Sequence, residues 1–91
     1  MIATHTFHVV GKCPTGLPNY YAVEIICRAF VPCETLVETA EALLAEPTYQ
    51  ETFTQSLADK LGWPVVTTCS HLAGGKVKTR CECEPKRRAK S

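Results

Sequence analysis

The pattern of apolar and polar positions predicts two strands in the first third of the chain. Residues 4–10 alternate weakly between polar and apolar side chains and lead to Gly11, which predicts a first strand. Residues 20–31 alternate more strictly, and Pro32 ends the run. Between them, residues 13–19 read CPTGLPN, whose two prolines and glycine predict a loop. The second strand would place six residues on its apolar face, namely Tyr21, Val23, Ile25, Cys27, Ala29 and Val31, with Glu24 and Arg28 opposite.

The middle of the chain predicts two helices. Between residues 34 and 46 the apolar side chains recur at helical spacing, and Pro47 ends the pattern; they are Leu36, Val37, Ala40, Leu43 and Leu44. The next helix begins at Thr48, since Thr48 and Glu51 have the spacing of a capping box, in which each side chain bonds the other residue's backbone N–H. Phe53, Leu57 and Leu61 follow at steps of four, and Gly62 with Pro64 ends this helix.

The last third predicts a hairpin of two strands. Residues 64–72 and 76–84 form the strands, and residues 73–75 the turn. In the last strand Val77, Thr79, Cys81 and Cys83 share one face, and charged residues occupy the other: Lys76, Lys78, Arg80, Glu82 and Glu84. The order β-β-α-α-β-β predicts an α+β fold, an antiparallel four-stranded sheet with two helices on its apolar face. A charged second face and open sheet edges favour edge-to-edge assembly into an oligomeric barrel.

Composition predicts the cellular compartment of the protein and a basic C-terminal tail. The 91 residues are 45% hydrophobic and 21% charged, which is typical of one globular domain, here residues 1–84. No long apolar run or signal peptide is recognisable, so we expect a cytoplasmic protein with no membrane segment. Residues 85–91, PKRRAKS, hold four of the ten basic side chains and no acid. We expect this tail to be disordered, and its charge would also suit contact with the phosphates of tRNA or DNA.

Six cysteines in a short chain raise the question of disulfides or a metal. A reducing compartment favours free thiols, and the closest pair, Cys81 and Cys83, is too tight for zinc spacing, so we expect no metal. Cys27, Cys81 and Cys83 would face the helices as small hydrophobes. Cys13 differs because it stands at a strand end, before the loop. There it suits either a nucleophile with partial exposure or a structural loop cysteine.

Four short motifs then follow one another in a recognisable order. They are Cys-Pro-Thr-Gly-Leu-Pro-Asn at 13–19, Val-Glu-Thr-Ala-Glu-Ala-Leu at 37–43, Gln-Glu at 50–51 and Gly-Gly at 74–75. This order resembles the tunnelling fold, whose subunits are β-β-α-α-β-β units joined into barrels. More closely it resembles the QueF family of 7-cyano-7-deazaguanine nitrile reductases and its amidinotransferase-type relatives. The family's loop motif is Cys-Pro-x-Thr-Gly-Gln-Pro-Asp, and its base-holding pair is His-Glu; GTP cyclohydrolase I, of the same fold, has Gln-Glu there.

The resemblance implies a role for each matched residue. Cys13 would add to a nitrile carbon and form a covalent thioimide, a step that needs no cofactor. Asn19 stands in place of the family's acid/base Asp and cannot transfer a proton in the same way. Glu51, with Gln50, would hold the edge of a 7-deazaguanine-type base, free or in a nucleic acid. Three residues of the second motif would lie along the same base, namely Val37, Glu38 and Thr39.

Departures from the family shape the choice of reaction. Ala40 and Ala42 stand where the family's NADPH-dependent reductases have lysines, which favours amidine formation from ammonia over reduction. His71 lies near a zinc-binding histidine of the cyclohydrolases, but Ala73 replaces the accompanying cysteine. The resemblance further implies a homo-oligomer with sites between subunits.

Two other interpretations stay open. The chain is alternatively a non-catalytic tunnelling-fold module that binds a purine or pterin, or only assembles, which Asn19 and the shortened loop favour. Glu51 would then be a helix cap that needs no ligand. A small protein held together by disulfides is the third interpretation, which counting of free thiols would test.

Overall fold

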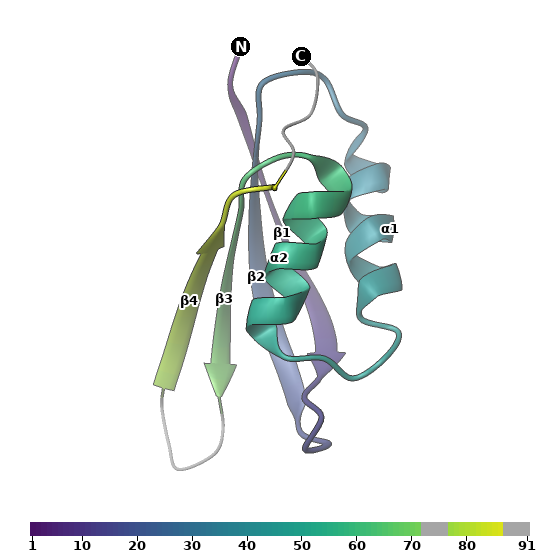
Figure 1. Cartoon of the computed structure of the whole chain (residues 1–91), viewed down its shortest axis with the longest axis vertical. Helices are drawn as coiled ribbons and strands as arrows, with labels where there is room; N and C mark the ends of the chain where they lie inside the picture. The colour runs from purple at the N-terminus through teal and green to yellow at the C-terminus, as the bar shows by residue number, and fades with distance from the viewer. Residues whose placement is uncertain (72–76, 87–91) are drawn as a thin grey trace.

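Four strands and two helices make up the part of the chain that the computed structural model describes, residues 1–71 and 77–86. The elements are β1 (Ala3–Lys12), β2 (Pro18–Cys27), α1 (Cys33–Leu43), α2 (Gln50–Leu61), β3 (Val65–His71) and β4 (Val77–Cys83). The strands form one antiparallel sheet in the order β1-β2-β3-β4, and both helices cover the same face (Figure 1). The predicted α+β fold and element order are confirmed. The turn predicted at 73–75 lies outside the described residues.

The strand register decides which residues face the helices. Tyr21 of β2 pairs with Val9 of β1 and with Cys69 of β3, and Cys69 pairs with Thr79 of β4. Because successive side chains of a strand point to opposite faces, every second residue from this row lies on the helix side. The core there also contains Leu36 and Ala40 of α1 and Phe53, Leu57 and Ala58 of α2. The expected inward positions of Cys27, Cys81 and Cys83 are confirmed, since they alternate in step with this row.

The second strand is shorter than its alternation predicts. β2 ends at Cys27 rather than at residue 31, because its partner strands end there: Ala3 of β1 pairs with Cys27, and β3 begins at Val65, opposite Ile25. Residues 28–31 leave the sheet, although Ala29 and Val31 still pack against the core. The alternation thus continues past the strand because the connecting segment must also bury apolar side chains.

The first helix ends three residues earlier than predicted. α1 runs from Cys33 to Leu43 instead of 34–46, and the Leu44 N–H is shared between the carbonyls of Ala40 and Glu41. Residue 46 precedes Pro47, and the proline ring disfavours helical backbone at the residue before it. Pro47 therefore accounts for the loss of residue 46 from the helix, while α1 already ends at Leu43 with Leu44 as its C-cap.

The capping box predicted for the second helix is wrong. α2 begins at Gln50 with Tyr49 as its N-cap and no side-chain cap. The backbone N–H of Thr48 instead donates to the carbonyl oxygen of Lys12, at 2.9 Å. This contact with the end of β1 holds Thr48 outside the helix, one residue before the cap. Gly62, with a φ of 76°, ends α2 as predicted, since glycine adopts the left-handed region without strain.

The chain after β4 begins by docking on α2. Pro85 is buried, the Lys86 backbone N–H donates to the Asp59 carboxylate at 2.9 Å, and Gln55 Nε2 donates to the Glu84 carbonyl at 2.9 Å. Residues 85 and 86 thus contact the folded domain, and the rest of the predicted tail lies outside the described residues.

The open face of the sheet differs from its prediction in where charge lies. Lys78, Arg80 and Glu82 lie along β4, where Arg80 pairs with Glu82, as alternation predicts. The register adds apolar residues from the other strands to this face, among them Val10, Tyr20, Ala22 and Val66. Charge on the open face therefore lies mainly along β4, and β2 adds Glu24. Neither helix of the described ranges is long and apolar enough to cross a membrane.

Candidate functional site

The loop between β1 and β2 is a tight turn that presents Cys13. The Gly16 N–H donates to the Cys13 carbonyl at 2.8 Å, and the Cys13 N–H donates to the Leu17 carbonyl at 2.9 Å. Gly16 has a φ of 93°, in the left-handed region that favours glycine. Two backbone hydrogen bonds and one glycine thus fix the loop locally, and the Cys13 side chain stays half-buried at its start.

The Cys13 thiol lies in surroundings that favour its thiolate. Hydrogen bonding to the Thr15 hydroxyl, and secondarily to the Thr15 backbone, lowers the pKa of Cys13 below that of an ordinary cysteine, against a small opposing effect of burial. By contrast, burial raises the pKa of Cys27 and of Cys69. Since the thiolate is the nucleophilic form, Cys13 is the described thiol best suited to nucleophilic attack.

Asn19 and Tyr21 form a buried polar pair on β2, close to the loop that carries Cys13. Asn19 is only 5% exposed, and its Nδ2 donates to the Tyr21 hydroxyl oxygen at 3.2 Å. The centroid of the Tyr21 ring lies 4.9 Å from that of the Phe53 ring. A Cβ added to Gly11 would lie 3.3 Å from Cε2 of Tyr21. Burial is the main reason that the pKa of Tyr21 is raised, and the hydrogen bond from Asn19 opposes it. Negative charge on Cys69, Cys13 and Glu51 raises the pKa further. The Tyr21 hydroxyl is therefore within electrostatic reach of both predicted functional groups, the Cys13 thiol and the Glu51 carboxylate.

Gln50 and Glu51 divide their roles at the start of α2. The Gln50 side chain is 3% exposed, and its Nε2 donates to the Thr79 carbonyl at 2.8 Å and to the hydroxyl and carbonyl of Thr67 at 3.2 and 3.3 Å. Its other side-chain atom, Oε1, is buried without a hydrogen-bond partner among the described residues. Glu51 is exposed, and the failed capping box leaves its carboxylate without that structural role.

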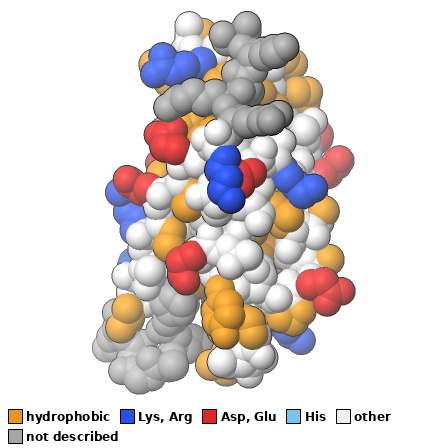
Figure 2. All heavy atoms as spheres, viewed as in Figure 1, with side chains coloured by type: hydrophobic (Ala, Val, Ile, Leu, Met, Phe, Trp, Pro, Cys, Tyr) orange, Lys and Arg blue, Asp and Glu red, His pale blue; other side chains and the backbone are white. Residues whose placement is uncertain are grey.

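Cys13, Asn19, Gln50 and Glu51 thus lie at one end of the molecule. Figure 1 shows the β1–β2 loop and the start of α2 at the same end, opposite the two termini. Large apolar side chains are also exposed here, among them Leu17 and Tyr49. Figure 2 shows apolar side chains gathered at this end of the helix-bearing face, with acidic and basic groups interspersed above them.

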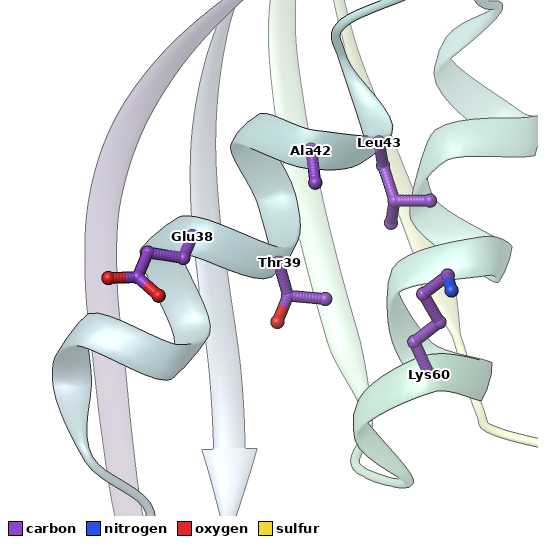
Figure 3. A pocket seen from close by; sticks show the side chains of 5 residues that line it. All are labelled: Glu38, Thr39, Ala42, Leu43 and Lys60. Atoms are coloured by element: carbon purple, nitrogen blue, oxygen red, sulfur yellow. The ribbon is translucent and has the colours of Figure 1, made fainter.

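The predicted residues of α1 lie elsewhere in the single chain. Glu38 and Thr39 line a hollow of about 530 Å³ with Ala42, Leu43 and Lys60, to which the Cys13 end contributes no residue. Figure 3 shows this hollow between α1 and α2, with Glu38 extending away from α2. The Thr39 hydroxyl donates to the Thr35 carbonyl at 2.6 Å, and Val37 is half-buried. The hollow that Glu38 and Thr39 line therefore does not include Cys13.

Two residues of the site carried no functional prediction, Thr15 and Tyr21. Tyr21 was assigned to the apolar face of its strand, where it does lie. The signal for more was Asn19, because strand alternation puts this polar residue on the same buried face, where it needs a hydrogen-bond partner.

A second cysteine lies near a histidine at the opposite end. Cys33 Sγ is 3.9 Å from His5 Nδ1, and both line a mainly apolar hollow with Phe30 and Met1. Cys33 is exposed, which makes it a natural comparison for Cys13. Within residues 1–71 and 77–86, no group of three or more potential ligands is arranged to hold a metal ion.

The chain matches no model of a known protein family, and no curated protein sequence matches it significantly.

Proposed function

We propose that the chain is a tunnelling-fold enzyme that converts the nitrile of a 7-deazaguanine-type base through a thioimide on Cys13. The observation that carries this proposal is the placement of a thiol with a lowered pKa at the same end as Glu51, whose carboxylate no helix cap uses. The tunnelling-fold assignment rests on the β-β-α-α-β-β order together with the resemblance of the motifs.

The chemistry needs one nucleophile and one nitrogen donor. The Cys13 sulfur attacks the nitrile carbon, one C–N π bond opens, and the nitrogen takes up a proton to complete the thioimide. Ammonia then attacks the same carbon and the Cys13 thiolate leaves, so that the base carries an amidine. Ala40 and Ala42 in place of the reductase lysines support this outcome over hydride transfer from NADPH.

Recognition of the base falls to the start of α2. The Glu51 carboxylate is suited to accept two adjacent N–H groups from a guanine-type edge, in charge-assisted hydrogen bonds. Gln50 Oε1 is a buried acceptor that lacks a donor, and a further N–H of the base would satisfy it. Glu38 and Thr39 would contact the base only from a second copy of the chain, which fits sites between subunits of a barrel.

A non-catalytic binding module is the second candidate function. It is favoured by Asn19, which cannot ionise and whose amide is bonded to Tyr21. In this case the base would bind beside Glu51 without forming a bond to Cys13.

Intact mass after incubation with 7-cyano-7-deazaguanine tests the covalent step. The wild-type chain and Cys33→Ala are expected to gain one mass of the nitrile, and Cys13→Ala is expected to gain none. Cys33→Ala is the matched control because Cys33 is exposed but lies at the other end of the molecule. An equal adduct on Cys13→Ala would contradict the proposal, and thermal stabilisation by the base without any adduct would favour the binding module.

Glu51→Gln tests base recognition separately. We expect it to weaken binding of the base by about 1.5–3 kcal/mol, since a hydrogen bond to a charged acceptor is lost. Glu34→Gln is the control, because Glu34 is the acidic residue in the first turn of the other helix. Calorimetry on the Cys13→Ala background measures binding alone. Equal affinities of the two variants would remove Glu51 from the site.

A further inference from the structure

The Tyr21 hydroxyl has an unused proton near the β1–β2 loop that carries Cys13: the Tyr21 ring lies against Gly11, two residues before Cys13, and Gly11 pairs with Asn19. Asn19 Nδ2 donates to the Tyr21 oxygen at 3.2 Å, so the phenol acts as acceptor in this bond. A tyrosine hydroxyl also has one hydrogen to donate. No described residue receives that hydrogen in a hydrogen bond. The described fold therefore does not use this hydrogen.

The surroundings hold this hydroxyl in place. Tyr21 is 1% exposed, and its ring is packed between Phe53 of α2 and the Gly11 backbone, on which Leu44 also packs. Asn19 and Tyr21 are two residues apart in β2 and share its helix-facing side. The ring therefore has little freedom to turn, and the position of its oxygen is set by the fold rather than by a ligand.

Resting on the proposed function, we infer that Tyr21 is the proton relay of thioimide formation and that Asn19 positions its hydroxyl. In this step the Cys13 sulfur bonds to the nitrile carbon and one C–N π bond opens. The nitrile nitrogen takes the Tyr21 hydroxyl proton, and the phenol oxygen takes the proton that Cys13 gives up. The product is a thioimide with one N–H, Tyr21 ends in its starting form, and no further reactant is consumed.

This assignment explains how a chain with Asn19 can protonate the nitrogen. An amide does not release a proton at neutral pH, but its N–H can stabilise the negative charge that develops on the phenol oxygen. The raised pKa of Tyr21 agrees with this role, because it keeps the phenol protonated until the nitrogen needs the proton. Asn19 would thus act through Tyr21 instead of replacing an acid.

Tyr21→Phe and Tyr20→Phe form a matched pair for the test. The two tyrosines are adjacent in β2, but Tyr20 lies on the opposite face and is 55% exposed. With 7-cyano-7-deazaguanine, Tyr21→Phe is expected to form the Cys13 adduct about 100-fold more slowly, the scale of general acid catalysis, and Tyr20→Phe at the wild-type rate. Increasing imidazole buffer at constant pH should restore part of the rate only in Tyr21→Phe, since imidazolium can supply the missing proton.

Binding must be unchanged for the relay to be the cause. On the Cys13→Ala background, Tyr21→Phe is expected to bind the base as tightly as the single variant. Weaker binding in proportion to the lost rate would show a structural role and overturn the inference. Asn19→Leu removes the donor without removing the phenol and is expected to slow the adduct about tenfold, with binding again unchanged. Asn19→Leu also tests the relay if Tyr21→Phe does not fold.

The outcomes separate the inference from the function on which it rests. A Cys13 adduct that forms at the wild-type rate in Tyr21→Phe and Asn19→Leu overturns the relay and leaves the proposed function intact. No adduct on the wild-type chain overturns both.

Discussion

Cys13 owes its expected reactivity to the two residues that follow Pro14. Gly16 closes the turn in the left-handed region, and Thr15 stabilises the thiolate by hydrogen bonding. Neither residue is reactive, and both lie within three positions of the sulfur. The lowered pKa of Cys13 is thus a local property of the loop, which is why the sequence around Cys13 could suggest a nucleophile before the fold was known.

The pH dependence of alkylation tests this at the residue scale. Because the pKa of Cys13 is lowered, its thiolate appears at lower pH than that of an ordinary cysteine, so its reaction with iodoacetamide should persist at lower pH. Thr15→Val removes the hydrogen bond that contributes most to the lowered pKa of Cys13, so the pH midpoint of Cys13 alkylation should rise. Peptide mass spectrometry at several pH values gives the rate of each cysteine. Cys27 and Cys69 should react last, because burial raises their pKa. A Cys13 midpoint unchanged in Thr15→Val would contradict this explanation.

At the scale of elements, α2 is fixed by buried polar contacts at its start. Gln50 Nε2 reaches both β3 and β4, and the Thr54 hydroxyl lies 2.6 Å from that of Thr67 while donating to the Gln50 carbonyl at 2.8 Å. These contacts place Glu51 one residue beyond the anchor, at the surface. The orientation of the candidate base-binding carboxylate therefore depends on a buried amide.

Gln50→Met should destabilise the fold by about 1–3 kcal/mol, because the Thr67 hydroxyl and the Thr79 carbonyl lose a buried donor. Gln55→Met is the control on the same helix, since its hydrogen bonds to Asp59 and Glu84 are exposed, and it should cost less than about 1 kcal/mol. Urea unfolding of both variants gives the comparison. Equal losses would mean that the buried amide is not the anchor.

Asp59 makes the docking of residues 85–86 sensitive to pH. The hydrogen bond from the Lys86 backbone N–H is the main reason that the pKa of Asp59 is lowered; burial opposes it, and Gln55 and the Lys86 charge add to the lowering. A folded pKa below the unfolded one stabilises the fold above the unfolded value, and this contribution is lost as pH falls through the folded pKa. Asp59→Asn should therefore melt below the wild-type chain at pH 7 and together with it in strong acid. A constant difference at all pH values would exclude this linkage.

The elements were predictable where local pattern decides them. Two-residue alternation placed Tyr21, Val23 and Ile25 on the buried face, and Gly62 marked the end of α2. Two of the errors came from distant contacts. The end of β2 depends on where β1 and β3 stop, and the capping box failed because Thr48 is bound to the carbonyl of Lys12, far away in the sequence.

The residues of the candidate site likewise fall into those that the sequence could suggest and those that only the structure identifies. Cys13 and Glu51 could be proposed from motifs, because each belongs to a short segment with its own chemistry. Tyr21 could not, since an aromatic residue on an apolar face is usually core, and only the Asn19 contact distinguishes it. The motif of α1 was placed on the base, yet the hollow that Glu38 and Thr39 line includes neither Cys13 nor Glu51.

For the whole molecule, the sheet order leaves β1 and β4 as unpaired edges. Each edge strand presents a row of backbone N–H and C=O groups to another strand, and β1 is the longer of the two, with ten residues against seven. Pairing of β1 with β4 of the next copy would extend the sheet into a barrel. It would also give Glu38 and Thr39 a way to reach the Cys13 end of a neighbour.

We therefore expect a homo-oligomer at micromolar concentration. Light scattering should give a mass that is a multiple of the 10.0 kDa chain and stable on dilution. Paired edge strands are held together mainly by backbone hydrogen bonds. Surface substitutions such as Glu34→Gln should therefore leave the mass of the oligomer unchanged. A monomer at this concentration would contradict the barrel and the sites between subunits.

The central claim is that the Cys13 thiol attacks a nitrile held by the base-binding residues beside it. The most direct measurement is a peptide map of the wild-type chain after incubation with 7-cyano-7-deazaguanine, with and without excess guanine. We predict that one nitrile mass appears on the peptide containing Cys13, that Cys33 stays unmodified, and that guanine slows the reaction. No modification, or equal modification of Cys13 and Cys33 that guanine does not affect, would contradict the claim.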